Sequence, residues 1–467
     1  MIIKFLLKRL VTVLCFFGIA VVGEASHIND VYICRDSQET LERLLPILAE
    51  AVSSIEISFC FAGGKPFRKI MEIISHRLEV VDCLKVKLMA WCIFLDENEQ
   101  NLLNNLKTSY PERFDYLYVN TIPSRFPDMN CYQNHQKFFV IDEKYFCLGG
   151  TNFEELMCSR GTEPLTDFAP FREHMIINDR SLGARDQDIM GRGSLAVEIR
   201  KEFYRQWGLW QTFEVNREHC DSMCPSDYVH ISLFDPVLAA CNVYDWDKVS
   251  NDIAHLNSET GEATCLFSGP HNKGDNPITQ AYIELIDKAE KEIIIGNLYF
   301  MLEKCLKEAL VKKASQGVCI KIVTNGCHDK APGIVGFFGW GNRFNYLPIM
   351  LGYSYFNIWD FGYSKKLSEK NVSIYEYHVD RVEYHKKILV VDRKSIIIGS
   401  YNLGRRSHLY DYEVVFKAES SKLANFLIKI MEEDIALSKK VTREEAESWQ
   451  FNFGYHFLGT SQNSLQS

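Results

Sequence analysis

The sequence has no excess of positive charge. Its 467 residues include 52 Lys and Arg against 61 Asp and Glu, a formal net charge of −9 at pH 7. It also has no dense basic run. Because nucleic acids are polyanions, this balance disfavours a processive or non-specific nucleic-acid binder. A local basic site remains compatible with it.

Long hydrophobic stretches are absent beyond the N-terminus. There, Lys4, Lys8 and Arg9 precede an apolar run at 10–22, and Gly23-Glu24-Ala25 has the form of a cleavage site. Thirteen uncharged residues fall short of the roughly 20 that span a bilayer. We interpret 1–25 as a cleaved signal peptide, with an uncleaved N-terminal anchor as the alternative. Export predicts a periplasmic, membrane-associated or secreted protein.

The 15 cysteines show no disulfide framework. Most stand singly in apolar surroundings, as buried thiols do; examples are Cys60, Cys147 and Cys319. One cluster differs and contains His219, Cys220, Cys224 and His230. Its spacing matches no zinc signature well, so a metal site, a local disulfide and free thiols all stay open there.

What the sequence does contain is one pattern that occurs twice, H-x-K-x4-D-x6-G-[GS]-x-N. The first copy consists of His135, Lys137, Asp142, Gly149, Gly150 and Asn152, and the second of His385, Lys387, Asp392, Gly399, Ser400 and Asn402. Each copy reads as an apolar strand, a turn and a second apolar strand. Since strand side chains alternate, His and Lys lie on the same face.

The repeat extends beyond the motif. In each half, helical and strand patterns alternate in the same order ahead of the motif, starting from a helix near Ser37 and from a helix that Asn276-Pro277 caps. The sequence therefore predicts two homologous α/β domains. Their predicted bounds are 30–215 and 261–455, joined by a connector at 216–260 and followed by a polar tail at 456–467.

A further acidic position follows each copy. Glu413 opens an apolar strand after Asn402, and Glu173 takes the same place after Asn152, behind a loop longer by about ten residues. We pair Glu173 with Glu413. Each carboxylate would hold the Nδ1–H of a histidine and so fix its tautomer, leaving Nε2 to react.

This residue set suits a phosphodiester. Two lysines and two asparagine amides can neutralise the equatorial oxygens of the transition state. One imidazole can attack phosphorus, and the other can protonate the leaving alcohol and then deprotonate the acceptor. The lysines replace the charge of a metal ion, so the expected chemistry needs no metal and no other cofactor.

The two motifs resemble the signature of the phospholipase D, or HKD, superfamily. The flanking segments 374–377 and 401–407 are similar to those of its bacterial members. The chain as a whole most resembles bacterial phospholipase D-like and cardiolipin synthase-like proteins, and its overall texture resembles chlamydial members. The resemblance implies two sandwich domains, each a mixed β-sheet flanked by helices, related by a pseudo-twofold axis with the active site at their interface. It also implies that His135 is the nucleophile, that His385 is the acid/base and that Asp142 and Asp392 are supporting residues. Ser400 in place of Gly150 predicts an asymmetric site.

The substrate class stays open. The segment 333–355 is rich in aromatic residues and glycine and could contact acyl chains or a membrane surface, or form a core helix. The stripe Phe203, Tyr204, Trp207, Trp210 and Phe213 predicts a core helix that closes the first domain. We favour a phospholipase D or transphosphatidylase acting on glycerophospholipids. An exported phosphodiesterase or nuclease and a membrane-associated effector with little turnover are the alternatives, and no function among them requires an oligomer.

Overall fold

The computed structural model describes residues 27–92, 95–120, 133–154, 157–164, 183–212, 252–272, 274–328, 333–351 and 371–449. The predicted signal segment 1–25, the His219–His230 cluster and the tail 456–467 lie outside these residues. No helix within the described ranges is long and apolar enough to cross a membrane.

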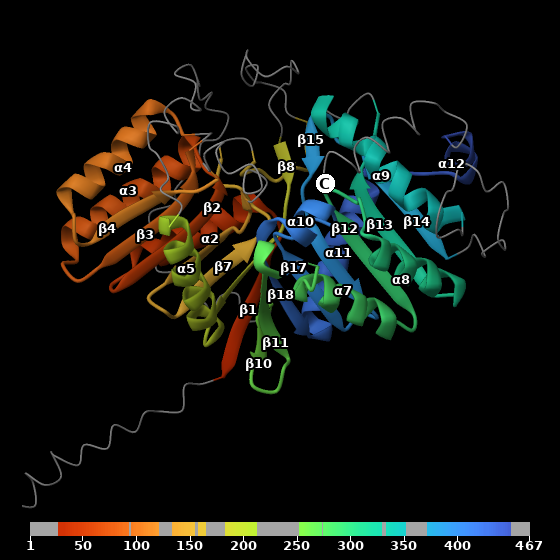
Figure 1. Ribbon diagram of the computed structural model, residues 1–467, viewed down its shortest axis with the longest axis horizontal. Coiled ribbons are helices and arrows are strands. Elements are labelled where there is room, and N and C mark those ends of the chain that lie inside the picture. Colours follow the sequence, from red (N-terminus) through yellow and green to blue (C-terminus); the bar gives the residue numbers. More distant parts are fainter. Residues whose placement is uncertain are drawn as a thin grey trace, which may run out of the picture.

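The two halves repeat one order of elements (Figure 1). The first half consists of β1 (Ile28–Cys34), α2 (Ser37–Ala49), β2 (Ser54–Phe61), α3 (Gly64–Val80), β3 (Lys85–Trp91), α4 (Glu97–Ser109), β4 (Phe114–Tyr118), β5 (Gln133–Asn134), β6 (Phe138–Ile141), β7 (Tyr145–Gly149), β8 (Gly183–Arg185), β9 (Asp188–Arg192) and α5 (Leu195–Thr212). The second consists of β11 (Ala263–Ser268), η3 (Pro270–Asn272), α7 (Pro277–Lys288), β12 (Glu292–Asn297), α8 (Lys304–Ser315), β13 (Cys319–Asn325), α9 (Gly333–Leu351), β14 (Val372–Tyr377), β15 (Val382–Tyr384), β16 (Lys387–Val391), β17 (Ser395–Gly399), α10 (Arg405–Leu409), β18 (Asp411–Glu419), α11 (Ser421–Ala436), β19 (Ser438–Lys440) and α12 (Arg443–Trp449). The predicted alternation of helices and strands is therefore confirmed in both halves.

Each half has its own mixed β-sheet. With β10 (Ala254–Asn257) at the edge of the first sheet, the strand orders are β10-β1-β9-β7-β6-β2-β3-β4 and β11-β18-β17-β16-β12-β13-β14-β19. One hydrophobic core packs the first sheet against α2, α3 and α4, and a second packs the other sheet against α7, α8 and α9. A third core joins α5, α11 and residues of both sheets, so it spans the two halves. The expected arrangement of helix-flanked mixed sheets is confirmed.

Local signals explain where the helices begin. Asp36 accepts a hydrogen bond from Glu39 N (2.9 Å) at the start of α2. Asn276 accepts bonds from the N–H groups of the second and third residues after it, and Pro277 occupies the first position of α7. An N-cap side chain satisfies N–H groups that have no partner within the helix.

The predicted connector contributes to the first sheet. Within 216–260 the structure describes only residues 252–260, and these contain β10 (Ala254–Asn257), which pairs antiparallel with β1. The chain then turns directly into β11 of the second sheet. Figure 1 shows β10 and β11 together at the boundary between the halves. This end of the connector is thus an ordered part of the interface.

The two aromatic segments are mainly core. Residues 333–351 form α9, whose Tyr346 and Leu347 are fully buried. In α5, Phe203 and Trp210 are fully buried, while Tyr204 is 38% exposed. Phe213 lies outside the described residues. The core-helix interpretation is confirmed for both described segments.

Two short strand pairs cross between the halves. β5, directly before His135, pairs parallel with β18 of the second half. β15, directly before His385, pairs parallel with β8 of the first half. Figure 1 shows β8 and β15 meeting between the two sheets. This reciprocal exchange brings both motifs to one interface, as a twofold relation between the halves requires.

The motif aspartates tie each hairpin turn to its sheet. Asp142 and Asp392 have positive φ values of 54° and 50°, which aspartate tolerates better than most residues. The Asp142 carboxylate accepts bonds from the N–H groups of Val52, Ser53 and Ser54 at 2.7–3.1 Å. Asp392 accepts equivalent bonds from the N–H groups of residues 290–292 at 2.8 Å. These contacts give both aspartates a structural task.

Asp392→Ala should therefore destabilise the second half. The change removes a charged acceptor from three N–H groups and places alanine at a positive φ, so we expect a loss of about 3 kcal/mol. Urea unfolding followed by circular dichroism measures this loss. Asp392→Asn, which keeps one acceptor oxygen and tolerates the same backbone conformation, should lose less. Equal losses in the two variants would contradict the N–H contacts as the cause.

Candidate active site

Each motif histidine is held by a carboxylate from the other half. His135 Nδ1 lies 3.0 and 3.1 Å from the two carboxylate oxygens of Glu413 on β18. His385 Nδ1 lies 2.5 Å from Asp186, between β8 and β9. The backbone repeats the exchange, since His135 N donates to Tyr412 O (3.0 Å) and His385 N to Arg185 O (2.9 Å). With Nδ1 engaged, Nε2 is the reactive nitrogen of each ring.

The pairing of Glu173 with Glu413 is corrected by this geometry. Gly149 is opposite Asp188 in the first sheet, and Gly399 is opposite Val415 in the second. Two residues earlier in the chain in each half, Asp186 therefore corresponds to Glu413. Glu173 itself lies outside the described residues.

The equivalence of Asp186 and Glu413 could not be predicted from sequence spacing, because the two halves differ in the distance from the motif asparagine to the carboxylate. Asp186 follows Asn152 by 34 residues, whereas Glu413 follows Asn402 by only 11. The available signal was the pair of acidic residues Asp186 and Asp188 at the start of an apolar strand, similar to Asp411 and Glu413 in the second half. That pattern alone would align Asp188 with Glu413, whereas the sheet register aligns Asp186 with it.

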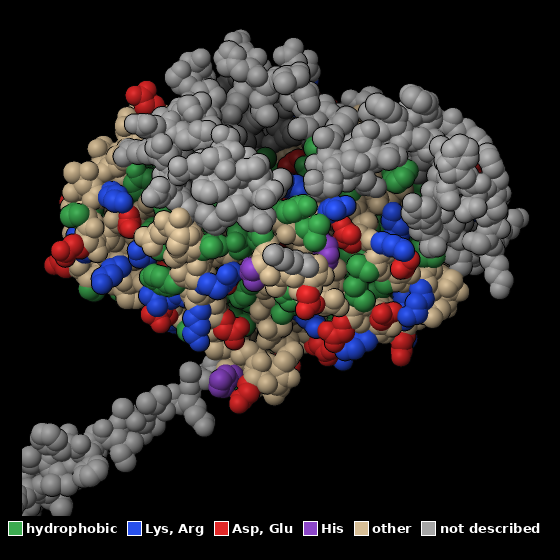
Figure 2. Space-filling model, in the orientation of Figure 1, with side chains coloured by type: hydrophobic (Ala, Val, Ile, Leu, Met, Phe, Trp, Pro, Cys, Tyr) green, Lys and Arg blue, Asp and Glu red, His purple; other side chains and the backbone are tan. Residues whose placement is uncertain are grey.

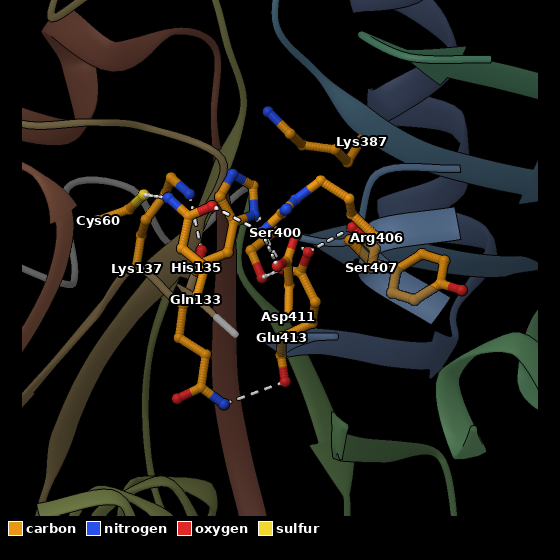
Figure 3. Close-up of polar contacts among 12 residues, drawn as sticks. Cys60, Gln133, His135, Lys137, Lys387, Ser400, Arg406, Ser407, Asp411 and Glu413 are labelled. Carbon is orange, nitrogen blue, oxygen red and sulfur yellow. Dashed lines mark hydrogen bonds and ion pairs between the residues drawn. The ribbon is translucent and has the colours of Figure 1, made fainter. Parts of the chain in front are cut away.

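The two lysines lie in the same buried region. Each ammonium group donates to the carbonyl of the histidine two residues earlier, Lys137 at 2.7 Å and Lys387 in an equally direct contact. Both lysines are almost fully buried. Figure 3 shows Lys137 and Lys387 entering the region around His135 and Glu413 from the two halves. Two positive charges thus lie where an anionic phosphodiester would be neutralised.

Burial keeps both histidines neutral near pH 7. Desolvation lowers the pKa of His135 to about 4, against the opposing charge of Glu413 and with the help of both lysines. Desolvation likewise lowers the pKa of His385 to about 4, with Lys387, only 2.7 Å from Nδ1, adding to the effect. The charges of both lysines act on both rings, so the motifs form one electrostatic cluster.

The carboxylates remain ionised. Burial raises the pKa of Glu413, but the His135 contact and Lys137 outweigh it, and the pKa lies below its ordinary value. The same balance, with His385 and Lys387 as partners, lowers the pKa of Asp186. Each neutral imidazole can therefore donate its Nδ1–H to a carboxylate, which directs the Nε2 lone pair toward substrate.

The two asparagines differ. Asn152 accepts a bond from Phe61 N (3.3 Å), and its amide nitrogen lies 3.3 Å from Met157 Sδ. Asn402 is 8% exposed, and its buried Oδ1 has no hydrogen-bond partner among the described residues. The second amide is thus the less constrained of the two.

Ser400 and Gly150 make the site asymmetric, in agreement with the sequence. The hydroxyls of Ser400 and Ser407 both donate to the Glu413 carboxylate, Ser407 at 2.5 Å. At Gly150 a Cβ atom would come within 2.0 Å of Asp186 Oδ1. A side chain at Gly150 would have to displace the Asp186 carboxylate, which holds His385 Nδ1. Gly149 and Gly399 are limited in the same way by Asp188 and by the Val414 carbonyl.

Several site residues were missed by sequence reasoning. Glu383 is buried with Oε1 3.8 Å from His385 Nε2. Asp411 is buried and paired with Arg406 at 2.7 Å (Figure 3). Burial raises the pKa of each carboxyl to about 7. Tyr299 interacts electrostatically with Glu383 and packs edge-on to Phe338 of α9, 4.9 Å between ring centroids.

A buried ion cluster joins the halves behind the site. Asp434 on α11 pairs with Arg185 of the first half at 2.7 Å and with Lys386 at 2.6 Å. Lys386 and Asp434 are fully buried. Because Arg185 adjoins Asp186 and Lys386 adjoins His385 in sequence, their shared contact with Asp434 fixes the relative position of β8 and β15.

Asp434→Ala should destabilise the protein strongly. The change leaves Arg185 and Lys386 buried without their shared partner, which typically costs about 3–5 kcal/mol. Chemical denaturation measures the loss. Lys386→Met leaves the Arg185–Asp434 pair intact and should cost clearly less. A loss from Lys386→Met as large as that from Asp434→Ala would contradict the role of Asp434 as the shared partner of Arg185 and Lys386.

No cluster of three or more His, Cys, Asp or Glu that could hold a metal ion occurs among the described residues. The ten cysteines recorded in that part of the chain are free thiols, and Cys83 and Cys305 are exposed. In the described part of the site, the cations Lys137, Lys387 and Arg406 lie with the buried carboxyl groups of Asp186, Glu383, Asp411 and Glu413.

Comparison with known families identifies the second half. Residues 282–435 match the family described as "Cardiolipin synthase, PLD-like domain". They form a phospholipase D-like domain. The match includes the complete second motif and Glu413, and the first half repeats the same topology around its own motif.

Relatives extend the likeness over the chain. The major cardiolipin synthase of Bacillus subtilis (strain 168) is 20% identical over 89% of this chain and 71% of its own. A cardiolipin synthase of Clostridium perfringens (strain 13 / Type A) is 21% identical over 90% of this chain and 73% of its own. The crystal structure of phosphatidylserine synthase from Haemophilus influenzae Rd KW20 covers 93% of this chain and 92% of that chain, with a TM-score of 0.60 and 12% identity. The chain thus has the two-domain phospholipase D-like fold.

Proposed function

We propose that this protein transfers or hydrolyses the phosphatidyl group of glycerophospholipids through a phosphohistidine intermediate. The observation that carries the proposal is the pair of histidines, each bound at Nδ1 by a carboxylate from the opposite half. This arrangement supplies two oriented Nε2 atoms at one interface. The likeness to cardiolipin synthases supports phospholipid as the substrate class.

The reaction has two half-reactions. The Nε2 lone pair of His135 attacks phosphorus, the bond to the leaving alcohol breaks, and that oxygen receives a proton on the His385 side. An acceptor alcohol or water then returns a proton to the His385 side and attacks phosphorus. The phosphorus–nitrogen bond breaks and restores His135. Lys137 and Lys387 stabilise the charge on the equatorial oxygens in both steps.

The test uses the purified chain and vesicles of phosphatidylglycerol labelled in the acyl chains. Conversion to a diphosphatidyl product or to phosphatidic acid supports the proposal and separates transfer from hydrolysis. A single-stranded oligonucleotide is the competing substrate. Cleavage of the oligonucleotide with no change in the lipid would overturn the proposal in favour of a nuclease.

Chelation should leave the reaction unchanged. Because Lys137 and Lys387 supply the positive charge of the site, we expect the lipid reaction in EDTA to match the untreated rate within about twofold. Initial rates before and after dialysis against EDTA measure this. A rate that collapses in EDTA and returns with a divalent cation would show that the lysines do not suffice.

A further inference from the structure

Glu383 lies beside the reactive nitrogen of only one histidine. It sits on β15, two residues before His385, with Oε1 3.8 Å from His385 Nε2. This is the nitrogen on the opposite side of the ring from Asp186. Glu383 cannot neutralise a phosphate as the lysines do, and it does not bind a histidine Nδ1 as Asp186 and Glu413 do. Its buried carboxyl group therefore has no role in the mechanism described so far.

The equivalent position in the first half carries no carboxyl group. Gln133 holds the equivalent position on β5, two residues before His135. Its amide group lies 3.7 Å from Cys60 Sγ and 3.5 Å from Arg406 (Figure 3). An amide does not exchange a proton with an imidazole near neutral pH, whereas a carboxyl group does. The two halves of the site therefore differ in their capacity to store a proton.

The surroundings of Glu383 favour its protonated form. Burial raises the pKa of Glu383 to about 7, Asp186 adds to the rise, and Lys387 opposes it. The other titratable groups that face it are His385 and Tyr299. No arginine or lysine pairs with Glu383 within 4 Å in the described part of the chain. Since burial opposes a proton on His385, Glu383 is the better proton store of the two.

The geometry allows both groups to contact one oxygen atom. An atom about 2.8 Å from Glu383 Oε1 can also lie about 2.8 Å from His385 Nε2, because these two atoms are 3.8 Å apart. The leaving oxygen in the first half-reaction, or the acceptor oxygen in the second, meets that condition. On the His135 side, the buried carboxyl of Asp411 is paired with Arg406 at 2.7 Å, and among the described residues no carboxyl other than Glu413 lies within 4 Å of His135.

We propose that Glu383 and His385 act as one acid/base pair that shares a single proton. This inference rests on the proposed function. As the bond between phosphorus and the leaving oxygen breaks, the pair gives its proton to that oxygen, which keeps the bonding electrons. In the second half-reaction the acceptor loses its proton to the pair as it attacks phosphorus, and His135 is released with its electron pair. The pair thereby makes the His385 half the side at which alcohols leave and enter, and His135 the nucleophile.

The test compares two leaving groups. Wild type, Glu383→Gln and Glu383→Asp are assayed on phosphatidylglycerol, whose leaving alkoxide needs a proton, and on the p-nitrophenyl ester of phosphatidic acid, whose leaving phenolate does not. We expect Glu383→Gln to lower the rate on phosphatidylglycerol about 100-fold, and to leave the rate and amplitude of the p-nitrophenol burst close to wild type. Glu383→Asp should recover part of the lost rate.

The pH profile gives a second readout. In wild type, the rate on phosphatidylglycerol should fall as pH rises above about 7, because Glu383 loses its proton there. Glu383→Gln should lack this limb of the profile. Equal losses on both substrates would assign Glu383 a structural role, and no loss on either would make it irrelevant; each result overturns the inference. A wild-type protein inactive on both substrates would instead refute the proposed function.

Discussion

His385→Asn should stop turnover of phospholipid but still release one equivalent of p-nitrophenol from the p-nitrophenyl ester of phosphatidic acid. The variant keeps His135 and Glu413, which lie 3.0 Å apart, so the nucleophile stays oriented. It lacks the acid for a poor leaving group and the base for the acceptor. We expect the lipid rate to fall about 10³-fold. Stopped-flow absorbance measures the burst, and the trapped protein should carry a base-stable phosphorylated histidine.

His135→Asn is the matched variant. It retains His385, Glu383 and both lysines, but no imidazole remains to attack phosphorus, so we expect neither turnover nor a burst. Circular dichroism and thermal unfolding establish that both variants are folded. A burst from His135→Asn together with none from His385→Asn would exchange the two roles. Substantial lipid turnover by either variant would refute the two-histidine mechanism.

The repeated motif made much of this site predictable from sequence. Strand periodicity and identical spacing located the histidines, the lysines and the turn aspartates in each half. The alternation argument does not apply to His135 and Lys137, because they lie between β5 and β6 and not within a strand. The order of helices and strands followed from apolar periodicity and from caps such as Asn276. These are local properties, so a single sequence can reveal them.

The exchanged contacts were not predictable in the same way. His135 contacts Glu413 at a sequence separation of 278 residues, and His385 contacts Asp186 at a separation of 199. The periodicity of helices and strands is local, so it cannot predict contacts between residues so far apart in sequence. Glu383 corresponds to Gln133 in the first copy. A search for residues shared by the two copies therefore does not identify Glu383 as a site residue. The parts of the site that differ between the halves appear only once both halves are placed together.

The exchange of carboxylates predicts a large effect at a residue outside both motifs. Asp186→Asn should lower the lipid rate by about 10²–10⁴-fold. Asparagine fits the same space but can present its amide N–H to His385 Nδ1, which favours the wrong tautomer and leaves Nε2 protonated. The initial rate on phosphatidylglycerol measures this effect, and circular dichroism with thermal unfolding confirms the fold. Glu413→Gln should act equally on His135, because its contact with Nδ1 is equivalent.

Glu173→Gln is the control that separates the two assignments for the first half. Among the described residues, Asp186 is the carboxylate that corresponds in sheet register to Glu413 and contacts His385 Nδ1, at 2.5 Å. We therefore expect Glu173→Gln to keep a rate within about threefold of wild type while Asp186→Asn loses it. The reverse result would give the orienting role back to Glu173. It would also mean that His385 takes its carboxylate from a segment other than the one that pairs with β15, which would remove the physical reason for the crossed strands.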